Sequence, residues 1–337
     1  MGKMRFGVIG LGWFGEKHCE ALAELADVEL YALCTRNQSR LYEVAQRFGV
    51  VRTFTDYHEM LRDPELDAVS IVTMWDQHAA PTLAALAAGK HVFLEKPMAS
   101  TVADCEQIVQ AAERARGSLM VGHICRFNPR YAAAKEAIAA GRIGRILSMY
   151  ARRNIPAAVT AGLLDKIGPI IGDGVHDTDL MLWFSQDKVV SAYAQSVNVR
   201  GMKYPDLGWT MYRFAGGATG ILENIWCLPD RTPFQIDERM EIIGTTGSIH
   251  IQETHPNFSI SDGDGWQSPD TTYWPTLHGR RSGALVAELA YFARCIREGE
   301  RPAVITPRES LEAVRACLAA EESARTGAVV RVGHAAA

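Results

Sequence analysis

The chain has 337 residues, of which 47% are hydrophobic and 22% charged, with a formal net charge of −4. This composition is ordinary for a globular protein of about two domains and excludes a disordered chain. The net negative charge gives no electrostatic reason to expect nucleic-acid binding. No apolar run approaches the ~20 residues that a membrane-spanning helix needs. The seven cysteines form no Cys-x-x-Cys pair, and no signal-peptide pattern is present. We therefore expect a cytoplasmic protein with neither nucleic acid nor membrane as a partner.

The first third of the chain alternates short apolar runs with helical patterns. The expected strands are residues 4–9, 28–34, 68–73, 91–94 and 119–121, and the expected helices are residues 13–25, 38–48, 77–88 and 102–114. Short strands that alternate with longer helices indicate parallel βαβ units. Such units build one twisted sheet with helices on both faces. The sequence predicts a doubly wound α/β domain of the Rossmann type at residues 1–122.

A different pattern follows and predicts an α+β domain at residues 123–337. Its expected helices are residues 131–140, one that begins near Val175, 284–297 and 307–324, and its expected strands are residues 146–152, 189–199, 208–214, 219–226, 237–243, 248–251 and 329–332. Consecutive strands with short turns are typical of antiparallel pairing, so we expect a large, open, mainly antiparallel sheet. An open sheet face needs a cover, which predicts a homodimer or homotetramer through this sheet. Residues 253–283 have little pattern and are expected to form a functional or oligomer-forming excursion.

A glycine-rich turn separates the first expected strand from the first expected helix. Gly10, Gly12 and Gly15 have the spacing Gly-x-Gly-x-x-Gly, with Trp13 and Phe14 between the last two. The first glycine allows a tight turn, the second lets a pyrophosphate approach the backbone, and the third lets the helix pack on the strand. The pyrophosphate then meets the positive end of the helix. These five residues are therefore predicted to bind NAD(P), in preference to forming a glycine turn without a ligand.

The residues after the second expected strand bear on the choice between NAD and NADP. A carboxylate commonly binds the ribose hydroxyls of NAD at this place, whereas this chain has Thr35, Arg36 and Asn37. A hydroxyl beside an arginine accommodates the 2′-phosphate of NADP, and both Arg36 and Arg40 can reach it. We therefore favour NADP and keep NAD as the alternative. The competing interpretation of Arg36 is a solvated loop residue.

Two further motifs are Ala-Ala-Gly-Lys-His-Val-Phe-Leu-Glu-Lys-Pro at residues 87–97 and Gly-Val-His-Asp-Thr-Asp at residues 174–179. Together with the glycine turn and Ile-Gly-Thr-Thr-Gly-Ser at residues 243–248, they resemble the Gfo/Idh/MocA family of sugar and cyclitol oxidoreductases over essentially the whole chain. The resemblance implies hydride transfer between a nicotinamide and a carbinol or carbonyl carbon of a sugar, cyclitol or sugar derivative.

The resemblance also implies which residues carry the chemistry. It places Lys96, with Glu95, beside the nicotinamide, and a lysine after a parallel strand lies where ligands bind in open α/β sheets. His176 can exchange a proton with a carbinol near neutral pH, although a histidine at a helix start is the competing interpretation. Many family members have an aspartate four residues before this histidine, where this chain has Gly172. Asp173 either replaces that aspartate in the proton path and at the substrate or caps the helix.

The remaining candidates follow other expected strands. Thr73, Trp75 and His78 are expected at the cofactor, although the family usually has Pro-Asn after the threonine. Trp75 either stacks on the sugar or nicotinamide or packs at the rim of a cleft. Further candidates for substrate binding, beside Lys96, Asp173 and His176, are Arg126, Asn128 and Asn154.

Two other functions remain open, and both are known in the family that the chain resembles. One is a non-catalytic NAD(P)-binding regulator of sugar metabolism, which the presence of both Lys96 and His176 disfavours because a sensor needs no proton relay. The other is an NAD-dependent glycosidase, which hydrolysis of a nitrophenyl glycoside without added cofactor would reveal. No metal is expected, because His176, Asp177 and Asp179 lack the spacing of a zinc motif.

Overall fold

A computed structural model describes residues 2–252, 258–263 and 265–333 of the chain. The chain forms two compact units, Met1–Asn128 with Thr271–Leu311, and Pro129–Asp270 with Glu312–Ala337. The first unit thus includes a late segment that the sequence pattern assigns to the second domain. The predicted domain boundary after residue 122 stays a prediction.

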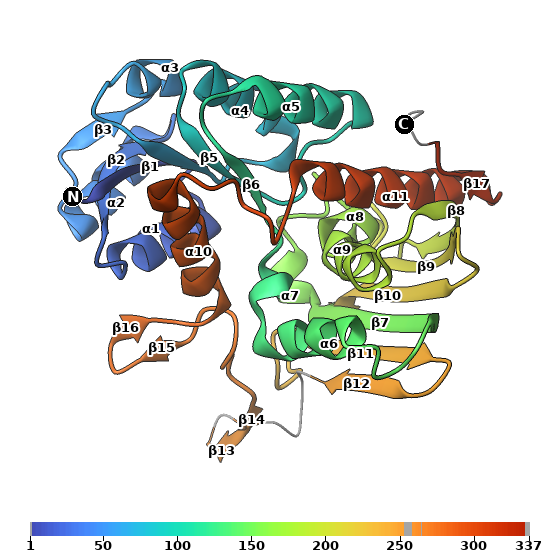
Figure 1. Cartoon of the computed structure of the whole chain (residues 1–337). Helices are drawn as coiled ribbons and strands as arrows, with labels where there is room; N and C mark the ends of the chain where they lie inside the picture. The colour runs from blue at the N-terminus through green and yellow to red at the C-terminus, as the bar shows by residue number, and fades with distance from the viewer. Residues whose placement is uncertain (1, 253–257, 264, 334–337) are drawn as a thin grey trace. The chain divides into compact units, whose positions relative to one another are not determined.

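The first unit is built on a six-stranded parallel sheet in the order β3-β2-β1-β4-β5-β6 (Figure 1). Its strands are β1 (Met4–Ile9), β2 (Val28–Cys34), β3 (Arg52–Phe54), β4 (Ala68–Ile71), β5 (His91–Glu95) and β6 (Leu119–Gly122). Its helices are α1 (Trp13–Ala23), α2 (Gln38–Phe48), α3 (Tyr57–Leu61), η1 (Trp75–Gln77), α4 (Ala79–Ala87), α5 (Val102–Arg114), η2 (Ile124–Phe127) and α10 (Ala284–Glu298). The doubly wound sheet is confirmed, and its order reverses between β1 and β4, where such sheets bind ligands.

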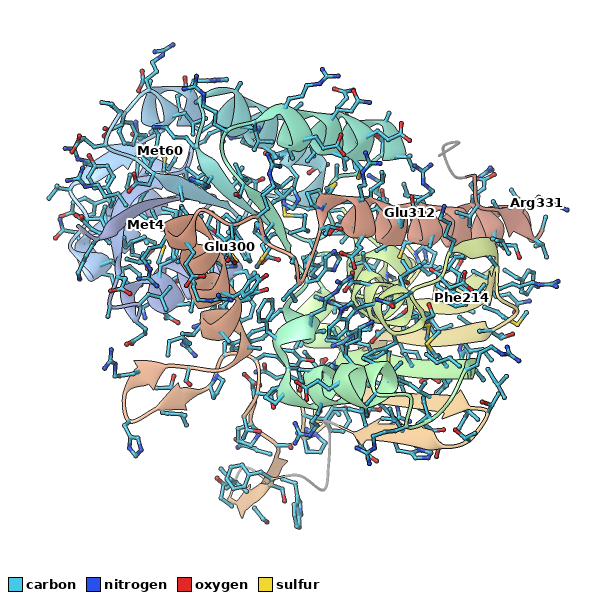
Figure 2. All side chains as sticks on the ribbon, in the orientation of Figure 1. Met4, Met60, Phe214, Glu300, Glu312 and Arg331 are labelled. Atoms are coloured by element: carbon cyan, nitrogen blue, oxygen red, sulfur yellow. The ribbon has the colours of Figure 1, made fainter. Side chains whose placement is uncertain are left out.

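Helices cover both faces of this sheet. Figure 1 shows α3, α4 and α5 on one face and α1, α2 and α10 on the other. Strands β4 and β6 are therefore nearly continuous apolar runs, and every residue of both is buried. Phe6, Phe93 and Met60 are fully buried, and Figure 2 labels Met60. Local signals fix the helix ends: Asn37 accepts a hydrogen bond from the Arg40 N–H at the start of α2, and Gly49 ends that helix at φ +67°.

The second unit is built on a seven-stranded sheet in the order β12-β11-β7-β10-β9-β8-β17. Its strands are β7 (Ile146–Pro156), β8 (Val189–Val197), β9 (Leu207–Phe214), β10 (Thr219–Leu228), β11 (Asp237–Gly244), β12 (Ser248–Gln252) and β17 (Val330–Arg331). Its helices are α6 (Pro129–Ala139), α7 (Ala157–Thr160), α8 (Pro169–Gly172), α9 (Gly174–Ser185) and most of α11 (Pro307–Thr326). The β7–β10 pair is parallel and the other pairs are antiparallel, which confirms the expected, mainly antiparallel sheet.

One face of the second sheet carries the core of its unit. Along β9, Thr210, Tyr212 and Phe214 (labelled in Figure 2) are buried, and the Tyr212 hydroxyl lies 3.2 Å from the Thr178 hydroxyl of α9. The alternate residues Trp209 and Met211 are 41% and 47% exposed. This alternation is the period of a strand with one covered and one open face.

The excursion predicted at residues 253–283 contains two small hairpins in its described part. They are β13 (Ile260–Asp262) with β14 (Gly265–Gln267), and β15 (Thr276–Leu277) with β16 (Arg280–Arg281). Residues 253–257 and 264 of the excursion lie outside the described residues. Arg280 and Arg281 donate to Glu24 and Glu20, so β16 is tied to α1 by ion pairs. Over the described ranges, no helix has the length and apolar content to cross a membrane.

Candidate functional site

Backbone contacts shape the glycine turn after β1. Gly10 has φ +97°, and a Cβ there would lie 2.5 Å from the Val72 carbonyl oxygen. A Cβ at Gly15 would lie 2.0 Å from the Gly10 carbonyl oxygen, so α1 packs against the turn only with glycine at this position. A Cβ at Gly12 would meet no atom within 4 Å, and no side chain caps α1. The turn therefore fits a pyrophosphate that approaches Gly12 and accepts from the first N–H groups of α1.

The two aromatic residues of the turn belong to a cluster with the late part of the first unit. The ring of Trp13 lies 5.7 Å from that of Trp274, and the ring of Phe14 lies 5.6 Å from Trp274 and 5.0 Å from His18. Trp13 remains 62% exposed. The cluster orients the start of α1, whose N–H groups are the donors of the predicted pyrophosphate site.

The residues predicted at the adenosine ribose differ in how they are engaged. Arg40 donates to the Leu11 carbonyl oxygen at 3.0 Å and forms ion pairs with Glu16 and Glu43, so it braces the glycine turn against α2. Arg36 is exposed and donates to the Gln77 side chain at 3.1 Å. Of the two arginines, Arg36 therefore presents its guanidinium to solvent at the end of β2.

His78 joins two turns at the carboxyl edge of the sheet. Its ring is 1% exposed, with Nδ1 2.8 Å from the Pro97 carbonyl oxygen and Nε2 3.0 Å from the Thr73 carbonyl oxygen. Burial lowers the pKa of His78, while the two carbonyl contacts oppose that shift. His78 thus supports Thr73 and the cis Lys96–Pro97 peptide from inside, and Trp75 stands half-buried at the start of η1.

Lys96 follows β5, and its backbone N–H is held by the buried carboxylate of Glu95. The Lys96 N–H donates to Glu95 Oε2 at 3.1 Å, and Glu95 Oε1 lies 3.1 Å from His18 Nε2. The other ring nitrogen of His18 lies 2.8 Å from the Ser70 hydroxyl. Glu95 is 5% exposed and His18 is fully buried. A Cβ at position 122 would lie 2.6 Å from Glu95 Oε1, so Gly122 leaves the space that this carboxylate needs.

A second buried carboxyl group, that of Glu288, interacts electrostatically with Glu95. Glu288 of α10 is fully buried, and neither of its oxygens has a hydrogen-bond partner among the described residues. Burial, with a contribution from the charge of Glu95, raises the pKa of Glu288 well above its ordinary value. Burial therefore favours the protonated form of Glu288.

Arg126 and Asn128, expected near the substrate, are both buried in the first unit. Arg126 donates to the Val304 carbonyl oxygen at 2.6 Å and forms an ion pair with Glu309 at 3.0 Å. The Asn128 amide donates to the Tyr273 hydroxyl at 3.4 Å. These contacts attach the end of the β6 segment to the late segment of the same unit, and a contact with substrate stays a prediction.

The candidates of the second unit gather at the start of α9 and along β7. Asp173 Oδ1 lies 4.0 Å from His176 Nε2, and the two side chains are 17% and 8% exposed. Asn154 is 4% exposed, donates to Glu223 at 2.6 Å and accepts from the Ile225 N–H at 3.0 Å. Asp173 thus faces the imidazole across one turn, whereas Asn154 fixes β7 to β10.

The sequence names Arg153 as a weaker candidate for substrate binding, but it does not predict the buried ion cluster that Arg153 forms next to His176. Arg153 donates to both carboxylate oxygens of Asp177 at 3.1 Å and to Glu238 at 3.0 Å, while Tyr131 donates to Glu238 at 2.6 Å. Burial raises the pKa of Asp177 to about 6, and Arg153 opposes that shift. The cluster anchors the first turn of α9 to β7 and β11. Among the described residues, no group of three or more His, Cys, Asp or Glu side chains could hold a metal ion.

Family models match both halves of the chain. Residues 4–123 match the model of an oxidoreductase family with an NAD-binding Rossmann fold, and residues 131–250 match a GFO/IDH/MocA C-terminal domain. The chain belongs to the Gfo/Idh/MocA oxidoreductase family. The resemblance carried by the sequence motifs is thereby confirmed, and the glycine turn of this oxidoreductase lies in the matched NAD-binding part.

Several relatives of this oxidoreductase are named inositol dehydrogenases. The scyllo-inositol 2-dehydrogenase (NAD(+)) of Bacillus subtilis is 30% identical over 98% of this chain and 96% of its own length. The myo-inositol 2-dehydrogenase of Thermotoga maritima is 29% identical over 89% of this chain and 90% of its own length. A structure of scyllo-inositol dehydrogenase from Lactobacillus casei with NAD(H) and scyllo-inositol is 24% identical, covers 98% of this chain and 99% of its own, and has a TM-score of 0.84. This likeness confirms the fold.

Proposed function

We propose that this oxidoreductase transfers a hydride between a nicotinamide dinucleotide and a secondary carbinol of a cyclitol, sugar or sugar derivative, with a cyclitol as the first choice. The observation that carries the proposal is the place of Lys96. It follows β5 at the carboxyl edge of the sheet that holds the glycine turn, and Glu95 fixes its backbone. The inositol dehydrogenases named above support the substrate class, because their similarity spans nearly the whole chain.

The chemistry requires a base for one proton. A bound nicotinamide dinucleotide would supply the hydride acceptor. As the carbinol C–H bond breaks, the O–H proton passes to the chain and a carbonyl forms. We assign this proton to Lys96 and His176, with Asp173 orienting the imidazole and stabilising its charged form. In the reverse direction the same groups return the proton to the carbonyl oxygen.

The test compares Lys96→Ala with Lys3→Ala, the replacement of an exposed lysine of the same unit. Purified variants are incubated with each dinucleotide and a panel of inositols, sugars and sugar acids, and reduced nicotinamide is followed by absorbance. We expect Lys96→Ala to lose turnover by about 100-fold or more while still binding the dinucleotide, and Lys3→Ala to match wild type. Unchanged turnover in Lys96→Ala would refute the assignment. If wild type binds the dinucleotide but turns over no substrate, a regulator is favoured instead. If wild type hydrolyses a nitrophenyl glycoside without added cofactor, a glycosidase is favoured.

We propose NADP as the preferred cofactor, with NAD as the alternative. The support is the exposed guanidinium of Arg36 beside Thr35, and the lack of a carboxylate at residues 34–37. The test measures kcat/KM for both dinucleotides in wild type and Arg36→Ala, with Arg62→Ala as the control at another exposed arginine. Arg36→Ala should lower kcat/KM for NADP about tenfold and leave that for NAD unchanged, because a charge-assisted contact to the 2′-phosphate is lost. Equal effects on both dinucleotides would contradict the proposal.

We also propose a cytoplasmic homodimer or homotetramer that forms through the open face of the second sheet. The exposed apolar side chains Val197, Trp209, Met211 and Ile243 all lie on strands of that sheet and support this proposal.

A further inference from the structure

Gly172, the last residue of α8, lies against the ring of Trp226. A Cβ built at Gly172 would lie 2.5 Å from Cη2 and 2.8 Å from Cζ2 of Trp226, which is closer than side-chain carbons approach. Trp226 is 1% exposed, so its ring cannot move aside into solvent. The six-membered part of the indole therefore occupies the volume that any side chain at position 172 would need.

The other edge of the same indole faces Asp173. Trp226 Nε1 donates to Asp173 Oδ2 at 2.8 Å, and Asp173 Oδ1 lies 4.0 Å from His176 Nε2. The carboxylate thus lies between an indole N–H and an imidazole. A hydrogen bond to an ionised carboxylate is stronger than one between neutral groups, and it fixes which oxygen points to the histidine.

The backbone of Trp226 is held from several sides. Trp226 lies where the pairing of β10 with β7 shifts register, between Ile225 and Leu228. Its N–H donates to the Asp206 carbonyl oxygen at 2.7 Å, and its carbonyl oxygen accepts from Thr160 at 2.9 Å and from Arg200 at 2.8 Å. An irregularity in a strand re-aims the side chain at that point, and these contacts fix the new direction.

We propose that Trp226 is a positioning residue for the proton transfer at His176. Its indole N–H holds the Asp173 carboxylate toward the imidazole. Its ring occupies the volume that a side chain at position 172 would need, and glycine at that position leaves this volume open. The role in proton transfer rests on the proposed function, whereas the contacts of Asp173 with Trp226 and His176 do not. The nearby charged groups Asp177, Arg153 and Glu238 form their own cluster and remain unchanged in every variant used below.

The first test compares Trp226→Phe, Asp173→Asn and the double variant in the full-length protein. Trp226→Phe keeps an aromatic ring and removes the donor. Trp183→Phe, at a half-buried tryptophan of α9, is the matched control. We expect the NMR titration midpoint of ¹³C-labelled His176 to fall in Trp226→Phe and in Asp173→Asn, and not in the control. kcat should fall about tenfold with the KM for the dinucleotide unchanged, and the double variant should be no worse than Asp173→Asn. An unmoved His176 titration, or effects that multiply in the double variant, would overturn the proposal.

The second test needs neither turnover nor a folded Trp226 variant. In ¹⁵N-labelled protein, the indole N–H resonance of Trp226 should move upfield in Asp173→Asn, because the donor loses a charged acceptor. The resonances of the other tryptophans should stay in place. An unmoved Trp226 resonance would overturn the assignment. If no polyol is oxidised, the proposed function fails, while this resonance and the His176 titration still decide the role of Trp226.

Discussion

At the scale of single residues, the position of Lys96 depends on what lies beneath it. Glu95 connects the Lys96 backbone to His18, and the Ser70 hydroxyl lies within hydrogen-bond distance of that imidazole. Burying a carboxyl group is costly unless it is hydrogen-bonded, so these contacts offset the cost of burying Glu95. A turn fixed in this way holds the lysine in place without using the lysine side chain.

Glu95→Gln tests this interpretation, with Glu288→Gln as its matched control. The amide of Glu95→Gln loses the charge that His18 and the Lys96 N–H share, so we expect kcat to fall about tenfold and the free energy of unfolding to fall by about 1–3 kcal/mol. Glu288 is buried, and neither of its oxygens has a hydrogen-bond partner among the described residues. An amide at this position therefore breaks no hydrogen bond, and both quantities should change little. Steady-state kinetics and urea unfolding measure the two effects. Equal losses in both variants would show that the charge of Glu95 has no special role.

At the scale of elements, the three glycines before and within α1 have different reasons to be glycine. Gly15 is required by the fold, because a Cβ would collide with the Gly10 carbonyl oxygen. Gly12 is not required by the fold, because the space around a Cβ there is open. The missing side chain at Gly12 therefore matters only when a ligand approaches the backbone there.

This difference gives a paired prediction for Gly12→Ala and Gly15→Ala. Gly12→Ala should melt at the wild-type temperature and bind the dinucleotide at least tenfold more weakly. Gly15→Ala should lower the melting temperature by several degrees, because α1 must shift away from the turn. Differential scanning fluorimetry and fluorescence titration with reduced dinucleotide measure the two properties. Wild-type affinity in Gly12→Ala would mean that the pyrophosphate does not approach this turn.

Glu321 makes the stability contributed by α11 depend on pH. Burial raises the pKa of Glu321 from 4.5 to about 7. Between these values the unfolded chain has released the proton while the folded chain keeps it, so stability falls as the pH rises. Glu321→Gln removes this loss and should raise the free energy of unfolding at pH 8 by on the order of 1–2 kcal/mol, with a much smaller gain at pH 5. Urea unfolding at both pH values checks this, with the exposed neighbour Glu322→Gln as the control. An equal gain at both pH values would contradict the assignment.

At the scale of the whole molecule, the proposed oligomer forms through the open face of the second sheet. Trp209 and Met211 project from β9 on the side opposite the buried Tyr212. An apolar patch on an open sheet is a typical surface for a symmetric partner. The proposed oligomer places this patch in its interface.

Light scattering tests this proposal. We expect a wild-type mass that is twice or four times the 37.0 kDa of one chain. The double variant Trp209→Glu with Met211→Glu should shift that mass toward 37.0 kDa, because two carboxylates would be buried without partners. Val51→Glu, at an exposed apolar residue of the first unit, should keep the wild-type mass. A monomeric wild type would refute the proposal.

The sequence by itself determined the elements and the places where chemistry gathers along the chain. Apolar periodicity predicted the doubly wound sheet and the mainly antiparallel sheet, because a strand or helix reports its burial through local spacing. It missed β3 and the short helices α3, α7 and α8, which span three to five residues each and carry too few periods to be recognised. The glycine turn and the strand end before Lys96 were visible because their function depends on neighbouring residues.

Only the tertiary structure decided which side chains meet. His18 lies 77 positions from Glu95, Trp226 lies 53 from Asp173, and the Arg126 guanidinium is bound by Val304, 178 positions away. The alternation of a strand shows which face a residue occupies, and it does not show which residue lies across from it. A register shift between β10 and β7 directs Trp226 to Asp173. Val304 and Glu309, in the late segment of the first unit, bury Arg126. Both arrangements arise from packing between distant segments. Local sequence carries no signal of such packing.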